Sequence, residues 1–306
     1  MKELIKKIVV DGMYTLAGII PKNKNLWLFG AWEGRIYADN SKYMFEYVNK
    51  NCPKIRAVWL TRNKNVINEV RRNKYECYHM FSLKGMWLSL RANVAFETEG
   101  NWDTSPFVNR EKSKVIQLWH GIAGKAAGWK DENGSPMYDK ESQRIMSSFW
   151  WMGTSQKYID VFSHYYGIPR ERFFLTGYPR NDTFVTKPYN MYIESLMSKH
   201  LGCKWIIYMP THRNFGKESI SSIEEFMYVD EMLRKENVYM VYKPHFHELK
   251  NVLSYEDKFT NIILAKEQEK FADVYSYIHY FDLLISDYSS IVYDFLCSNK
   301  PIVLFT

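Results

Sequence analysis

The chain has 306 residues, 46% of them hydrophobic, which is enough for one large domain or two of ordinary size. Its four cysteines stand far apart with no Cys-x-x-Cys pair, which argues against a zinc ribbon or a disulfide framework and favours a reduced, cytoplasmic protein. The net charge of +7 suits an anionic substrate, a nucleic acid or an acidic membrane surface, but no RNA-binding signature is present, so we expect no nucleic acid partner.

The first twenty residues predict an amphipathic helix. Apolar residues fall roughly on one helical face, while Lys2, Lys6 and Lys7 lie off it. Two interpretations fit this pattern: an interfacial helix on an anionic membrane, and a first helix that packs on its own domain. Asp11 and Gly12 interrupt the apolar run, so the segment is neither the core of a secretory signal nor a transmembrane span.

Strands alternate with helices at short spacing through the first half of the chain, which is typical of a parallel sheet with helices on its faces. We expect strands at residues 25–30, 55–60, 92–96, 115–119 and 173–176, and helices at 41–49, 66–73, 83–90, 142–151 and 158–166. Proline, glycine and asparagine lie close together in residues 177–182 and predict a turn between two domains. Arg180 in this turn is either a cleft residue or a solvated linker charge.

The strand predicted at 115–119 leads directly into His120 and Gly121. A histidine at the carboxyl end of a parallel strand lies at the ligand face of the sheet, and the glycine beside it lets a substrate approach the backbone. Histidine ordinarily titrates near neutrality, so it is suited to take a proton from an attacking hydroxyl. A lone histidine at a strand end is usually structural, but the glycines and Lys125 that follow favour a catalytic role.

In the second half, three predicted strands are each followed by polar groups that can donate to a phosphate. The strands are 204–209, 238–242 and 283–285, and they are followed by Thr211 and Arg213, by Lys243 and His245, and by Ser289 and Ser290. Further strands are expected at 261–264 and 302–305, and helices at 192–200, 274–279 and 291–296. Because the carboxyl ends of parallel strands share an edge, the polar groups predict a pyrophosphate site. For the two serines, capping of their own helix is the simpler alternative.

Five short motifs occur in order from residue 117 onward. They are Gln117-Leu118-Trp119-His120-Gly121 with Lys125 and Gly128, Gly177-Tyr178-Pro179-Arg180-Asn181-Asp182, Pro210-Thr211-His212-Arg213, Lys243-Pro244-His245, and Ser286-Asp287-Tyr288-Ser289-Ser290 with Asp294-Phe295. In this order they resemble the motifs of the CDP-glycerol glycerophosphotransferases of teichoic-acid and capsule synthesis. One motif alone is weak evidence, whereas five in the same order are strong. The region before residue 117 fits that family only in general pattern.

The resemblance implies an α/β protein of GT-B fold, in which two Rossmann-like domains face each other across a cleft. The helix of residues 1–20 would precede an acceptor domain at 21–178 and a donor-nucleotide domain at 179–306. The implied reaction moves glycerol phosphate or ribitol phosphate from a CDP-activated donor to a hydroxyl of a lipid-linked or polymeric acceptor, releasing CMP. The enzyme would work as a peripheral protein on the inner face of the cell membrane.

The resemblance also implies roles for individual side chains. His120 would be the general base on the acceptor hydroxyl, and His245 the second catalytic residue. The donor would be held by Thr211, Arg213, Lys243, His245, Asp287, Ser289 and Ser290, with Gly121, Lys125 and Arg180 near the cleft. The sequence offers no carboxylate cluster for a metal, so we expect neither metal nor cofactor, and cationic side chains and helix N–H groups would neutralise the leaving CMP.

Three features depart from the family pattern. His212 stands where an aromatic residue, usually tryptophan, is expected, and Phe246 stands where proline often follows the histidine. Family members continue past the strand at 302–305, so we expect a donor domain that is incomplete at Thr306.

Two other functions fit the sequence: a GT-B glycosyltransferase that uses a nucleotide sugar, and a non-catalytic, membrane-associated scaffold that binds anions.

Overall fold

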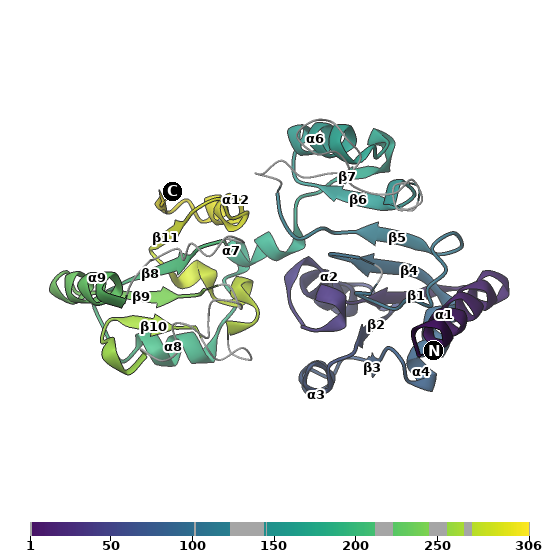
Figure 1. Ribbon diagram of the computed structural model, residues 1–306, viewed down its shortest axis with the longest axis horizontal. Helices are drawn as coiled ribbons and strands as arrows, with labels where there is room; N and C mark the ends of the chain where they lie inside the picture. Colours follow the sequence, from purple (N-terminus) through teal and green to yellow (C-terminus); the bar gives the residue numbers. More distant parts are fainter. Residues whose placement is uncertain are drawn as a thin grey trace. The chain divides into compact units, whose positions relative to one another are not determined.

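The computed structural model describes residues 2–100, 102–122, 144, 146–211, 223–244, 256–265 and 271–305; the side chains of residues 2–10 and 256 are not part of this description. The chain divides into two compact units. The first comprises residues 1–120 and 126–180, and the second comprises 121–125 and 181–306. Each unit contains its own parallel sheet (Figure 1). This parallel α/β architecture is the class that the alternating strands and helices predicted.

Within the described residues, the first unit contains a seven-stranded parallel sheet in the order β3-β2-β1-β4-β5-β6-β7 (Figure 1). Its strands are β1 (Asn23–Phe29), β2 (Arg56–Thr61), β3 (Cys77–His79), β4 (Ala92–Glu97), β5 (Lys114–Gln117), β6 (Trp150–Gly153) and β7 (Phe173–Leu175). Its helices are α1 (Lys2–Ile19), α2 (Asp39–Asn51), α3 (Lys64–Arg72), α4 (Leu83–Arg91) and α6 (Gln156–Tyr166), with 3-10 turns η1 (Trp32–Gly34), η2 (Arg170–Arg172) and η3 (Pro179–Asp182).

The strands of this sheet bury side chains on both faces. In β1, Trp27 and Phe29 point toward α2 and α3, whereas Leu26 and Leu28 point toward α4. Successive residues of a strand face opposite sides, so a strand covered on both faces needs a continuous apolar run. The run Leu26 to Phe29 has that composition, which explains why β1 lies in the interior of the sheet.

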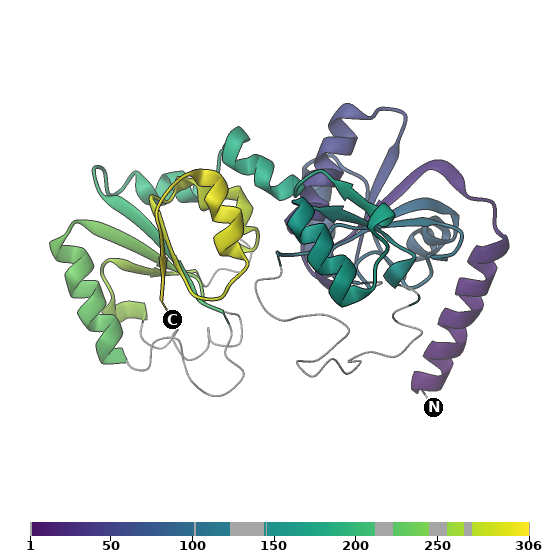
Figure 2. The same ribbon diagram turned by 90° about the horizontal axis from the view of Figure 1, so that it is seen from above.

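The C-terminal half of helix α1 packs against the rest of the first unit. Ala17 is fully buried, and the side-chain amide of Asn109 donates a hydrogen bond to the carbonyl oxygen of Tyr14 at 3.1 Å. Figure 2 shows α1 at the edge of the unit, with its N-terminal end pointing away from the sheet. No helix among the described residues is both long and apolar enough to cross a membrane.

The second unit contains, in the part of the chain that the structure describes, a five-stranded parallel sheet in the order β10-β9-β8-β11-β12. Its strands are β8 (Lys204–Met209), β9 (Val238–Tyr242), β10 (Ile262–Leu264), β11 (Leu283–Ser286) and β12 (Ile302–Leu304). Its helices are α7 (Thr183–Thr186), α8 (Met191–Met197), α9 (Ile223–Lys235) and α12 (Ile291–Phe295), with 3-10 turns η4 (Glu256–Lys258), η5 (Val274–Ser276), η6 (Ile278–Tyr280) and η7 (Leu296–Ser298). Tyr208, Met240 and Ile262 form a core with Phe226 of α9.

Several element predictions were wrong in detail. The helix expected at 142–151 runs into β6, because the apolar residues Trp150 to Met152 form a strand between β5 and β7. The helix expected at 274–279 consists of the two 3-10 turns η5 and η6. The strand expected at 115–119 ends at Gln117, and Trp119 has a positive φ of 56° that a strand does not contain. Strand β3 and helix α9 were not predicted.

Candidate active site

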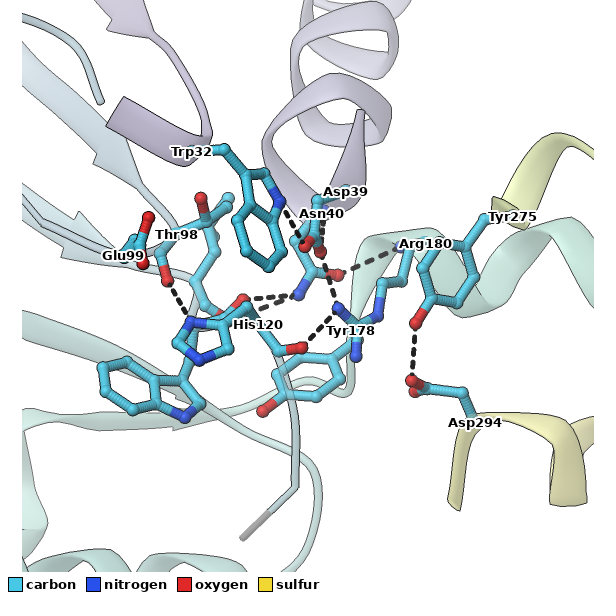
Figure 3. Close-up of polar contacts among 12 residues, drawn as sticks. Trp32, Asp39, Asn40, Thr98, Glu99, His120, Tyr178, Arg180, Tyr275 and Asp294 are labelled. Carbon is cyan, nitrogen blue, oxygen red and sulfur yellow. Dashed lines mark hydrogen bonds and ion pairs between the residues drawn. The ribbon is translucent and has the colours of Figure 1, made fainter. Parts of the chain in front are cut away.

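His120 lies three residues beyond the end of β5 and is half-buried. Its Nδ1 is 3.0 Å from the carbonyl oxygen of Thr98, the residue that follows β4 (Figure 3). A carbonyl oxygen only accepts hydrogen bonds, so Nδ1 carries the proton in this contact, and Nε2 of the neutral ring then holds the lone pair. The ring of Trp119 stacks on the imidazole with centroids 4.6 Å apart. The arrangement presents Nε2 as a proton acceptor.

The loop that supplies the Thr98 carbonyl is organised by Asp103, which is fully buried. The carboxylate of Asp103 accepts backbone N–H hydrogen bonds from Thr98 at 2.6 Å, Glu99 at 2.7 Å, Gly100 at 3.3 Å and Glu33 at 2.6 Å. Glu99 adds negative charge close to the histidine. Burial raises the pKa of the Glu99 carboxyl, Asp103 raises it further, and nearby His120 acts in the opposite direction.

Behind His120, Arg180 of η3 has a side chain that is only 1% exposed. Its Nη1 donates to Asp39 Oδ1 at 2.6 Å and to the carbonyl oxygen of His120 at 2.9 Å (Figure 3). Its guanidinium also lies 4.9 Å from the ring centre of Tyr178. The alternative interpretation of Arg180 as a solvated linker charge is therefore wrong.

In the second unit, Asp287 joins the ends of β8 and β11. Its carboxylate accepts hydrogen bonds from the Thr211 backbone N–H at 2.9 Å and the Thr211 hydroxyl at 2.8 Å, and Asp287 is 5% exposed. Just before it, the Ser286 hydroxyl donates to the Met209 carbonyl oxygen at 2.6 Å. These bonds place the residues after the two neighbouring strands side by side.

Ser289 and Ser290 follow this link and precede α12. Ser290 occupies the N-cap position but makes no side-chain capping hydrogen bond. The Ser289 hydroxyl accepts from the Ile291 N–H only at 3.4 Å, which is long for a hydrogen bond. Capping therefore accounts poorly for these two serines.

Lys243 follows β9 and is partly buried. Burial lowers the pKa of its ammonium group, and the charge of Asp273 opposes that shift. An anion that binds beside such a lysine stabilises the charged form of the side chain, which burial disfavours.

A family model described as CDP-Glycerol:Poly(glycerophosphate) glycerophosphotransferase matches residues 12–306. The chain belongs to this family. The five ordered motifs had predicted this glycerophosphotransferase membership, which the match confirms.

Relatives within the glycerophosphotransferase family differ in length. A teichoic acid poly(glycerol phosphate) polymerase of Staphylococcus epidermidis is 26% identical over 298 residues, which is 90% of this chain but 39% of that protein. A teichoic acid glycerol-phosphate transferase of Staphylococcus aureus is 24% identical over 328 residues, which covers 100% of this chain and 80% of that protein. This chain thus spans well under half of the first relative and most of the second.

A solved structure of the wall teichoic acid polymerase TagF has the same fold as this family member. The TM-score is 0.72 at 21% identity, over 99% of this chain and 77% of that chain. The likeness to TagF confirms the expected α/β fold with parallel sheets.

The predicted site residues divide into two groups with respect to this structure. His120 and Arg180 meet in the first unit, and Thr211 and Asp287 meet in the second. The described part of the structure also contains Gly121, Lys243, Ser289 and Ser290. Lys125, Arg213 and His245, together with the departures at His212 and Phe246, lie outside the described residues.

Sequence reasoning missed the residues that hold His120 in place: Trp32, Asp39, Asn40 and Thr98. Asp39 and Asn40 lie 80 positions or so from His120 and in no recognised motif, so spacing gave no signal for them. In the structure, Asp39 has a φ of 65° and is buried at the start of α2. Aspartate tolerates left-handed backbone better than most residues.

Proposed function

We propose that this chain transfers a polyol phosphate, with glycerol phosphate as the first candidate, from a CDP-activated donor to a hydroxyl of a polyol-phosphate or lipid-linked acceptor in teichoic-acid synthesis. Family membership and the names of the relatives support the substrate class. The observation that carries the mechanism is the Nδ1 contact of His120 with the Thr98 carbonyl, which presents Nε2 as the proton acceptor.

In the proposed step, the acceptor hydroxyl oxygen attacks the phosphorus that bears the polyol. A new oxygen–phosphorus bond forms as the bond to the CMP oxygen breaks, and the hydroxyl proton moves to Nε2 of His120. The electron pair of the broken bond leaves on CMP. The step needs no covalent enzyme intermediate, because positioning and charge stabilisation supply most of the catalysis in phosphoryl transfer.

The donor phosphates are assigned to the second unit. Ser289 and Ser290 offer hydroxyl donors that helix capping scarcely uses, and Lys243 supplies a cation. The bond between Thr211 and Asp287 fixes the turn that carries both serines. Arg213 and His245 are proposed to complete this site, and Lys125 and Gly121 to lie close to the acceptor. His245 is proposed as a second catalytic residue that stabilises the leaving phosphate.

Replacement of His120 by alanine tests the function. Release of CMP from CDP-glycerol should fall at least about a thousandfold, since general-base catalysis contributes up to about four orders of magnitude. The dissociation constant for CDP-glycerol, measured by calorimetry, should stay within about twofold. Parallel titrations with CDP-ribitol and UDP-N-acetylglucosamine identify the donor class. Unchanged CMP release in the folded variant, or selective binding of the UDP-sugar, would refute the proposal.

We also propose that α1 rests on an anionic membrane surface, which would place the enzyme at the inner face of the cell membrane. Lys2, Lys6 and Lys7 near the N-terminal end of α1 support this, as does the direction of that end away from the sheet (Figure 2). Co-sedimentation with phosphatidylglycerol vesicles measures the interaction. Equal sedimentation with neutral phosphatidylcholine vesicles, or none with either, would contradict the proposal.

A further inference from the structure

One buried cation connects three segments of the first unit that are far apart in the sequence. Arg180 of η3 donates through Nη1 to Asp39 at the start of α2 and to the carbonyl oxygen of His120 (Figure 3). Its backbone N–H also donates to the side-chain oxygen of Asn40 at 3.3 Å. The planar guanidinium can bridge separate acceptors because its N–H groups are fixed in one plane, which a lysine ammonium on a flexible stem does not reproduce.

Asn40 holds the two residues before the histidine. Its Nδ2 donates to the carbonyl oxygen of Trp119 at 2.9 Å and of Leu118 at 3.4 Å. With the Arg180 bond included, three successive carbonyl groups accept hydrogen bonds from side chains of other elements. Trp119 needs such support, since its φ of 56° is a left-handed conformation that a bulky side chain disfavours.

Asp39 is itself fixed from several directions. Its Oδ2 accepts from the indole Nε1 of Trp32 at 3.0 Å, and its Oδ1 accepts from the Asn40 backbone N–H at 2.7 Å. The centroids of the Trp32 ring and the His120 imidazole lie 5.7 Å apart. The network therefore reaches His120 through its backbone carbonyl and flanks its ring.

We propose that Arg180, Asp39 and Asn40 are positioning residues, which fix the backbone of residues 118–120 so that Nδ1 of His120 stays on the Thr98 carbonyl and Nε2 stays directed at the acceptor hydroxyl. This inference rests on the proposed base role of His120. Arg180 acts through His120 and does not touch the reacting atoms. Its buried bonds to Asp39 and to the His120 carbonyl support this indirect role.

The test uses Arg180→Lys, which keeps the positive charge but cannot bridge both acceptors, and Asp39→Asn, which keeps the side-chain shape. Arg110→Lys is the matched control, because Arg110 forms an equally buried ion pair with Glu97 at 2.7 Å in the same unit. Three quantities are measured on the full chain: kcat for CMP release, the dissociation constant for CDP-glycerol, and nitrogen-15 spectra of the histidine rings. The His120 signals are assigned from their absence in His120→Ala.

We expect Arg180→Lys to lower kcat about tenfold to a hundredfold, since a displacement of about 1 Å costs rates of that order. Donor affinity should stay within about twofold. The spectra should show His120 protonated on Nδ1 in the unchanged protein and a mixture of ring forms in Arg180→Lys and, to a smaller degree, in Asp39→Asn. Arg110→Lys should lower the melting temperature without changing the His120 signals.

Unchanged His120 signals in Arg180→Lys would overturn the positioning role, whatever happens to kcat. Should that variant fail to fold, Asp39→Asn decides the question by the same spectrum. Failure of the proposed function would look different: His120→Ala would keep its turnover, while the ring spectra would still report whether Arg180 orients the histidine.

Discussion

The two units use the polar residues after their parallel strands in different ways. Beyond β5 in the first unit, Asn40 of α2 donates to the Trp119 carbonyl, Arg180 of η3 donates to the His120 carbonyl, and the Thr98 backbone carbonyl after β4 binds the His120 ring. Beyond β11 in the second unit, Asp287 holds Thr211, but the hydroxyls of Ser289 and Ser290 are scarcely used in capping. The polar groups of the first region orient His120, whereas the two serine hydroxyls of the second region contribute little to helix capping.

The proposed chemistry explains this difference. A general base must offer one nitrogen lone pair in one direction and within hydrogen-bond reach of the hydroxyl, so its surroundings have to be rigid. A phosphate carries several acceptor oxygens and is bound by donors that point toward it, so those donors must not be occupied by the protein itself. Substitutions in the first region should therefore affect stability and turnover, and substitutions in the second should affect donor binding.

The substitution Asp103→Asn is expected to have the largest effect on the free energy of unfolding. The asparagine amide would place an N–H₂ group against backbone N–H donors that now meet a carboxylate oxygen, and we expect a loss of about 3 kcal/mol in the free energy of unfolding. Urea unfolding measures the loss. Turnover should fall as well, because the loop that Asp103 organises carries the Thr98 carbonyl.

Asp230→Asn is the matched control in the second unit. The Asp230 carboxylate accepts backbone N–H bonds from Thr260 at 3.0 Å, Asn261 at 2.7 Å and Ile262 at 2.8 Å, so it makes the same kind of contacts. We expect a similar loss of stability without a change in kcat at temperatures where the variant is folded. Equal kcat values for the two variants would remove the distinction drawn between the units.

A smaller effect is expected for the double variant Ser289→Ala/Ser290→Ala. Loss of two hydroxyl donors to a charged phosphate should weaken CDP-glycerol binding about thirtyfold, or ~2 kcal/mol. Stability should change by less than about 0.5 kcal/mol, since capping bonds are weak or absent at these residues. Calorimetry measures the binding and thermal unfolding the stability. A stability loss with binding intact would mean that the serines serve the fold.

The smallest main effect in this series should come from Lys243→Met, and it is a gain of stability rather than a loss. Burial lowers the pKa of Lys243 in the folded chain, so at neutral pH the unfolded chain holds the lysine proton more readily. The unfolding free energy of the unchanged protein should therefore rise with pH as Lys243 loses its proton, until the ordinary lysine pKa is passed.

The unfolding free energy of Lys243→Met should not rise with pH in this way. At pH 7 the variant should be more stable than the unchanged protein by up to about 1 kcal/mol, and it should bind CDP-glycerol more weakly. Denaturant titrations between pH 7 and 10 provide the comparison. Lower stability of the variant across that whole range would show that the electrostatic attraction of Asp273 for Lys243 outweighs the cost of burial.

The sequence by itself determined the class of fold, the family and the residues where chemistry is expected. Continuous apolar runs such as Leu26 to Phe29 indicate strands covered on both faces, because side chains alternate along a strand. The motif around His120 stood out since its residues are neighbours in the chain. The predictions failed where the local residue pattern and the tertiary context favour different elements. Trp150 to Met152, for example, lie in a strand between β5 and β7 and not in a helix.

Only the tertiary structure decided which nitrogen of His120 carries the proton and what holds it in place. Thr98 and Arg180 contact the histidine from separate elements, and Asp39 binds Arg180. Hydrogen bonds between residues 22 to 141 positions apart leave no periodic trace in a sequence. The structure also showed that Arg180 is buried rather than solvated, since the burial of a charge depends on partners that the fold brings to it.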